Sequence, residues 1–183
     1  MVRLACCAIA ATLTACGTTD DRPATLPYIT ETVLKPTCAS AQCHSSFARA
    51  GNPPRTDSKG NVSLGTSYSF ETVDDARAAF QGDAQLAVLD ELNTATPATL
   101  IRNLTIEQAT APRMPYDAPL PNADIDLIAR WLNDGLTGVC APGATKACNG
   151  KRVVPCTADG AYDLTQLSAA ITCPSKCVDG ACL

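Results

Sequence analysis

Eleven cysteines in a chain of 183 residues are the feature that most constrains what this protein can fold into. Such a content is unusual in the reducing cytosol but ordinary in exported proteins, where disulfide bonds persist. Residues 140–182 hold an even number of cysteines, which predicts three disulfides whose pairing the spacing leaves open. A zinc knuckle at CPSKC is the alternative, although no histidine lies nearby. The six cysteines of this stretch are Cys140, Cys148, Cys156, Cys173, Cys177 and Cys182.

The rest of the composition is that of a globular chain with a modest core. Apolar residues make up 46% of the sequence, but only 4% are aromatic and 13 are proline. We therefore expect one loop-rich domain plus a smaller unit, stabilised by cross-links or by a cofactor.

The N-terminal stretch MVRLACCAIAATLTACG predicts a secretion signal over residues 1–15. It has one basic residue, Arg3, then an apolar run and small residues before Cys16, and it is too short for a membrane-spanning helix. LTAC resembles the bacterial lipobox, which implies that Cys16 is lipidated and becomes the new N-terminus. The residue directly after Cys16 is glycine rather than aspartate, so the resemblance to Gram-negative lipoproteins implies the outer membrane, facing either the periplasm or the cell surface. A plain signal peptide or a membrane helix is the alternative.

Net charge excludes one class of partner. The formal charge is −4, so a phosphate backbone would be repelled, and we expect no binding to nucleic acid.

Helix signals divide the middle of the chain. Residues 16–27 are polar and read as a tether, after which an apolar pattern predicts a short helix that stops at Pro36. Residues 46–66 read as loop. Thr72 is positioned to cap a following helix, a second helix is expected over AQLAVLDEL, and a third from Pro97.

The strongest helix signals of this region lie at its end, between Asn122 and Gly135. Asn122 can cap it, and Gly135 can end it. Between them lies an apolar stripe that suits a helix packed on a core, and it includes Leu127, Ile128 and Trp131.

The stretch CASAQCH contains the residues whose chemistry is most informative about function. Cys38 and Cys43 precede His44, the only histidine of the chain. Covalent haem attachment needs two thiols for the two vinyl groups and an imidazole directly after the second thiol. The usual spacing is C-x-x-C-H; the two additional residues here lengthen the loop but leave the cysteine–histidine junction unchanged. Once the signal leaves, Met114 is the only methionine, and imidazole with thioether is a common axial pair that raises the reduction potential.

Together, TVLKPTCASAQCH and RMPYDAPLPNADIDLIARWLNDG resemble a monohaem cytochrome c domain of bacterial exported lipoproteins. The resemblance covers residues 28–136 and implies an all-α fold, followed by a disulfide-rich loop module over 137–183. It also implies one covalent haem c attached at Cys38 and Cys43, with His44 and Met114 as iron ligands. The residues it implies as haem packing on the last helix are Leu127, Ile128 and Trp131.

The expected function is electron transfer at the cell envelope rather than catalysis. One histidine leaves no serine–histidine–acid set, and the chain has neither a glycine-rich phosphate loop nor a second Cys-His pair. The acidic surface favours basic redox protein partners, with membrane contact only through the lipid anchor. The alternative is a haem-free lipoprotein with a binding or structural role, in which Cys38 and Cys43 form a disulfide. A copper site would need a second histidine.

Overall fold

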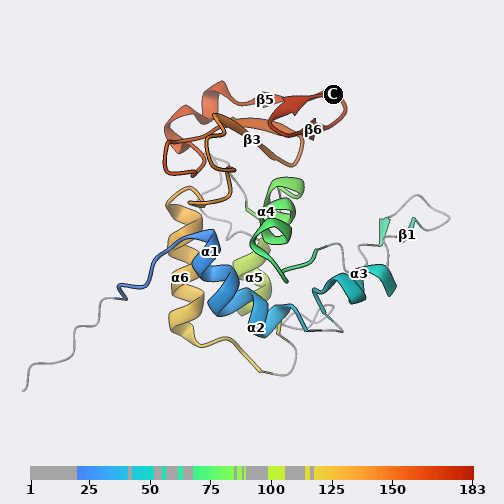
Figure 1. Ribbon diagram of the computed structural model, residues 1–183, viewed down its shortest axis with the longest axis vertical. Coiled ribbons are helices and arrows are strands. Elements are labelled where there is room, and N and C mark those ends of the chain that lie inside the picture. The colour runs from blue at the N-terminus through green and yellow to red at the C-terminus, as the bar shows by residue number, and fades with distance from the viewer. Residues whose placement is uncertain are drawn as a thin grey trace, which may run out of the picture.

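The computed structural model describes residues 20–40, 43–51, 55–56, 62–63, 68–84, 86–87, 89, 99–105, 114–115 and 118–183. The predicted signal peptide and Cys16 lie outside the described residues. In Figure 1 the helices form a body, and the strands of the C-terminal part lie together at one end of it.

A bent but continuous helix opens the body. It comprises α1 (Leu26–Ile29), a π-helical turn η1 (Thr30–Leu34) and α2 (Lys35–Cys38). The helix does not stop at Pro36 as the sequence predicts, because the π-helical turn directly before it changes the hydrogen-bond spacing and so accommodates the missing N–H of the proline. Hydrogen bonds of π spacing carry the chain through this region, and four apolar side chains bury one face: Leu26, Ile29, Val33 and Leu34.

Residues 46–66 contain more structure than the loop that the sequence predicts. A short helix, α3 (Ser46–Gly51), is followed by β1 (Arg55–Thr56) and β2 (Val62–Ser63). The two strands pair antiparallel, with Arg55 opposite Ser63.

Helix α4 (Val73–Gly82) begins where the sequence predicts. The Thr72 hydroxyl accepts a hydrogen bond from the backbone N–H of Asp75 at 3.1 Å, which confirms the predicted cap. Of the helix expected over AQLAVLDEL, residues 84, 86, 87 and 89 form turns or irregular backbone, which is not helical, and the other positions lie outside the described residues.

Two further helices complete the body, α5 (Thr99–Thr105) and α6 (Asn122–Asn133). Asn122 is the first helical residue rather than the cap, because Pro121 occupies the cap position. Gly135 ends the helix as predicted. Its φ is +85°, and a Cβ there would lie 2.7 Å from the Tyr162 carbonyl oxygen, so only glycine fits.

The C-terminal part is a small β structure, so the predicted all-α fold with a loop module is wrong. Strands β3 (Lys146–Asn149), β4 (Arg152–Pro155) and β5 (Ile171–Thr172) form an antiparallel sheet in the order β3-β4-β5. Gly150 and Lys151 are the two residues of the β3–β4 turn, and Gly150 has a φ of +60°, which suits a tight hairpin turn. Two of the four residues of β4 and both residues of β5 are β-branched, which favours strands over helix. After η2 (Leu164–Ala169) and β5, the chain ends in a second hairpin. Its strands are β6 (Cys177–Val178) and β7 (Ala181–Cys182).

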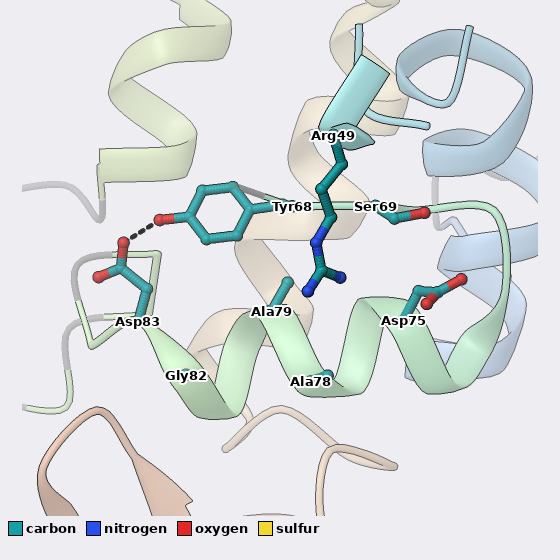
Figure 2. A pocket seen from close by; sticks show the side chains of 8 residues that line it. All are labelled: Arg49, Tyr68, Ser69, Asp75, Ala78, Ala79, Gly82 and Asp83. Carbon is teal, nitrogen blue, oxygen red and sulfur yellow. Dashed lines mark hydrogen bonds between the residues drawn. The ribbon is translucent and has the colours of Figure 1, made fainter. Parts of the chain in front are cut away.

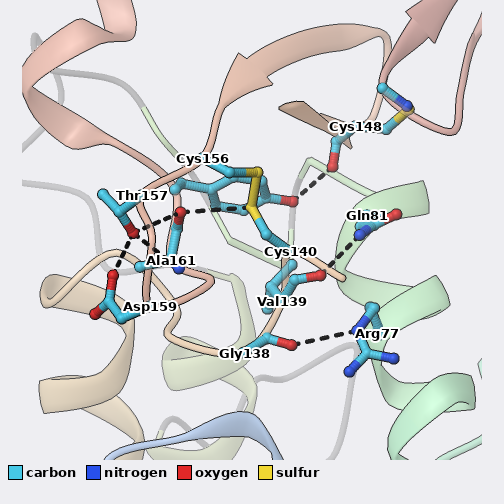
Figure 3. Close-up of a disulfide and its surroundings, with 12 residues drawn as sticks. Arg77, Gln81, Gly138, Val139, Cys140, Cys148, Cys156, Thr157, Asp159 and Ala161 are labelled. Carbon is cyan, nitrogen blue, oxygen red and sulfur yellow. Dashed lines mark hydrogen bonds between the residues drawn. A yellow bond between two sulfur atoms is a disulfide. The ribbon is translucent and has the colours of Figure 1, made fainter. Parts of the chain in front are cut away.

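Three disulfides cross-link residues 140–182, which confirms the predicted number. The sulfur atoms of all six cysteines are paired, and the bridges close loops of different length. The first of them is drawn in Figure 3. The pairs are Cys140–Cys156, Cys148–Cys177 and Cys173–Cys182.

The C-terminal part and the helical body share one hydrophobic core. Val154, Tyr162 and Leu167 of the C-terminal part belong to the same buried cluster as the helix residues. Hydrogen bonds reinforce the contact: the Gln81 side chain of α4 donates to the carbonyl of Val139 at 2.7 Å (Figure 3). Residues 137–183 are therefore packed against the body rather than suspended from it.

The chain before α1 is fixed to α6. Arg22 forms an ion pair with Asp124 at 2.5 Å and donates to the carbonyl of Ala123 at 2.7 Å. Arg130 donates to the carbonyl oxygens of Asp20 and Arg22, each at 2.8 Å. We call residues 20–22 the N-terminal strap.

Candidate functional site

The predicted attachment loop lies directly after the helix Leu26–Cys38. The backbone N–H of His44 donates to the carbonyl of Cys38 at 3.0 Å, and that of Cys43 donates to Ser40 at 3.0 Å. These bonds bring the backbone of the first cysteine next to that of the histidine, although five residues lie between them in the sequence. The two central residues of the insert, 41 and 42, lie outside the described residues.

Both cysteines of the loop are free thiols, in contrast to the six of the C-terminal part. Cys43 is exposed, whereas Cys38 is half-buried and its sulfur lies 3.4 Å from the Thr37 hydroxyl oxygen. Burial raises the pKa of the Cys38 thiol above its ordinary value. The thiolate is the reactive form, so a raised pKa favours the less nucleophilic thiol at Cys38.

The imidazole of His44 is half-buried against aromatic rings. The ring centroid of Phe70 lies 5.2 Å away and that of Tyr68 6.4 Å away. Burial lowers the pKa of His44, and a hydrogen bond with the Tyr68 backbone opposes this only in part. The ring is therefore neutral at pH 7, which is the form that binds a metal.

One nitrogen of this ring lacks a hydrogen-bond partner among the described residues. The Nδ1 atom of His44 is buried and has no hydrogen-bond partner within the described structure. Buried polar atoms in native proteins are almost always satisfied, so such an atom calls for an explanation, and a bound group is one.

Aromatic contacts connect this site to the core. The ring centroids of Phe70 and Phe80 are 6.3 Å apart. Those of Phe80 and Trp131 are 4.8 Å apart, in an edge-on arrangement. Trp131 is fully buried and donates from Nε1 to the carbonyl of Thr137 at 3.0 Å. Trp131 is predicted to pack against the haem. In the structure two other rings, those of Phe70 and Phe80, lie between it and His44 in this series of contacts. Leu127 and Ile128 of the same helix are also fully buried.

Met114 lies in the loop before α6. Its backbone N–H donates to the carbonyl of Asn103 on α5 at 2.9 Å, and 46% of its surface is exposed. The structure thus fixes the Met114 backbone to α5. No described contact joins its thioether to His44, so the axial pair stays a prediction.

An open pocket adjoins the His44 site. Its volume is about 340 Å³, and Figure 2 shows the Arg49 side chain of α3 extending over α4 toward it. The Tyr68 hydroxyl donates to the Asp83 carboxylate. Burial, and to a smaller extent this hydrogen bond, raises the pKa of Tyr68. Tyr68 therefore contributes to both features, its ring to the His44 site and its hydroxyl to the pocket. The lining residues are Arg49, Tyr68, Ser69, Asp75, Ala78, Ala79, Gly82 and Asp83.

Tyr68 and Phe70 are the site residues that the sequence analysis missed. They lie between the loop predicted over residues 46–66 and the Thr72 cap, where the sequence analysis made no prediction. The structure sets the backbone of Phe70 against the site through a 2.9 Å hydrogen bond from its N–H to the carbonyl of His44. The available signal was the alternation of aromatic residues in SYSF directly before the Thr72 cap, which indicates an extended segment with one side turned inward.

Comparison with models of protein families, with curated proteins and with solved structures found no match for this chain. Within the described residues, no group of three or more histidine, cysteine, aspartate or glutamate side chains is arranged to hold a metal ion.

Proposed function

We propose that this chain is an electron carrier of the bacterial cell envelope, holding one covalent haem c and anchored through a lipid on Cys16. The observation that carries the proposal is the closed loop with two free thiols and a buried imidazole nitrogen without a partner. Cys38 and Cys43 would hold the porphyrin, and His44 would bind the iron, with Met114 as the predicted second ligand. These residue types fit the group.

A bound haem would supply one-electron redox chemistry. The protein's own part is to orient His44 and exclude water from it. The backbone bonds to Cys38 and Phe70 fix the position of the histidine, and the Phe70 and Tyr68 rings cover the imidazole. A low-dielectric environment around an iron ligand disfavours the more highly charged ferric state, so these rings are expected to raise the reduction potential.

A haem-free lipoprotein with a binding or structural role is the second candidate. The three disulfides of the C-terminal part fit it equally well. The two candidates differ at Cys38 and Cys43, which are thioethers in the first and a disulfide in the second.

The test is expression with and without a cytochrome c maturation system, followed by denaturing electrophoresis with haem staining and by mass spectrometry. We expect one covalent haem per chain, and loss of covalent haem in a variant with both Cys38→Ala and Cys43→Ala. Phe47→Leu, an exposed residue on α3, is the matched control and should retain the haem. A haem-free wild-type chain with Cys38 joined to Cys43 would establish the second candidate instead.

The second ligand needs its own measurement. Met114→Ala should abolish the absorption band that reports thioether bound to ferric haem, while covalent attachment persists. Retention of that band in the variant would exclude Met114 as the ligand.

A further inference from the structure

We infer that the lipid anchor holds the α6 side of the folded body against the headgroups of the bilayer and turns the Cys38–His44 loop toward the aqueous phase. The inference rests on the proposed lipidation of Cys16. It goes further because it assigns a membrane-facing surface and, through it, the side from which redox partners approach.

The first step is that the folded body begins at the strap. Arg22 forms ion pairs with Asp20 at 2.9 Å and with Asp124 on α6. Arg130 donates hydrogen bonds to the carbonyl oxygens of the strap. The hydrogen bonds raise the pKa of Arg22 and lower that of Asp20. Both residues are therefore charged at pH 7, and the strap stays attached to α6.

The second step is the short reach of the anchor. Only four peptide units separate Cys16 from Asp20, and a fully extended chain spans at most about 3.6 Å per residue, or about 14 Å in all. A body of this size has a radius of gyration of about 15 Å. The molecule therefore cannot turn over on its anchor, and the surface around the strap must lie next to the bilayer.

The third step places the candidate site away from that surface. The helix Leu26–Cys38 runs from the strap toward the attachment loop, and its 13 residues advance by about 18 Å. In Figure 1 the strap enters beside α6, whereas α3, which follows the loop, lies on the opposite side of the body.

The exposed face of α6 suits headgroups rather than acyl chains. Asn122, Asp126 and Asn133 are exposed there, and their polar side chains would not enter a hydrocarbon layer. No helix in the described part of the chain is long and apolar enough to cross a bilayer. The acidic side chains would be repelled by an anionic surface, so a zwitterionic headgroup layer is the fitting neighbour.

Photo-crosslinking tests this orientation. The lipidated full-length protein is prepared with a benzophenone amino acid at position 126 on α6 or at position 47 on α3, and is reconstituted into phosphatidylcholine vesicles. After irradiation, mass spectrometry counts lipid adducts at each position. We expect adducts at position 126 to exceed those at position 47 by at least tenfold. Inserting ten Gly/Ser residues between Thr19 and Asp20 should reduce that ratio severalfold.

The outcomes separate the two levels of inference. Radiolabelled palmitate should be incorporated into the wild type and not into Cys16→Ala; absence of label from the wild type would overturn the proposed anchor and this orientation together. If the label is present but adducts are equal at the two positions, or favour position 47, only the orientation is overturned. The measurement does not depend on haem, so the redox proposal stands or falls separately.

Discussion

The aromatic contact between Phe80 and Trp131 should be a principal source of stability, because it joins α4 to α6 and connects both with the His44 site. Phe80 is fully buried and meets two rings, Trp131 at 4.8 Å and Phe70 at 6.3 Å. Each aromatic pair contributes about 1 kcal/mol beyond the area it buries. Phe80→Leu removes both pairs and nearly conserves volume, so we expect a loss of about 2 kcal/mol.

Urea denaturation of the disulfide-bonded protein, followed by circular dichroism, measures this loss. With a slope of about 2 kcal/mol per molar urea, the midpoint should fall by about 1 M. Phe47→Leu makes the same chemical change at a side chain that is 73% exposed, and it should change stability by less than about 0.5 kcal/mol.

A double-mutant cycle isolates the ring contact itself. We expect a coupling energy of about 1 kcal/mol between Phe80→Leu and Trp131→Leu. A coupling below about 0.3 kcal/mol, which is within the error of additivity, would refute the argument that the edge-on geometry contributes more than burial.

Three further outcomes follow from the structure. Because its hydrogen-bonded partner holds the pKa of Asp20 below the ordinary 3.8, strap stability should be complete above pH 4 and lost as the pH falls through the lowered pKa; hydrogen exchange over residues 20–25 measures this, and Asp20→Asn should remove the pH dependence. Gly135→Ala should cost more than Gly143→Ala by at least about 1 kcal/mol, because both have positive φ but only the first would clash with a carbonyl; equal thermal midpoints would contradict this. Replacing Cys140 and Cys156 by serine should cost about 3 kcal/mol in urea, since their bridge closes a 16-residue separation.

Local signals predicted helix positions well where backbone chemistry acts over a few residues. The Thr72 cap and the Gly135 terminus are found where expected, because each depends on one side chain or on its absence. The helix across Pro36 was missed because the π-helical turn redistributes its hydrogen bonds, which an i, i+3, i+4 pattern does not show.

The C-terminal part shows the limit of reading cysteines alone. Their number predicted three bridges, but pairing and strand register depend on contacts between residues far apart in sequence. The same limit applies to the candidate site. Cys38 and His44 could be selected from their spacing, whereas Tyr68 and Phe70 reach His44 only through tertiary packing.

The shared core also has a consequence for biogenesis. Tyr162 and Leu167 belong to the cluster that contains Phe80 and Trp131, so the core is complete only when the chain has been extended nearly to its last residues. If the chain is exported as proposed, the thiols of Cys38 and Cys43 would meet an oxidising compartment together with the six later ones during that interval. Haem attachment would then require Cys38 and Cys43 to stay reduced until the six later cysteines have paired.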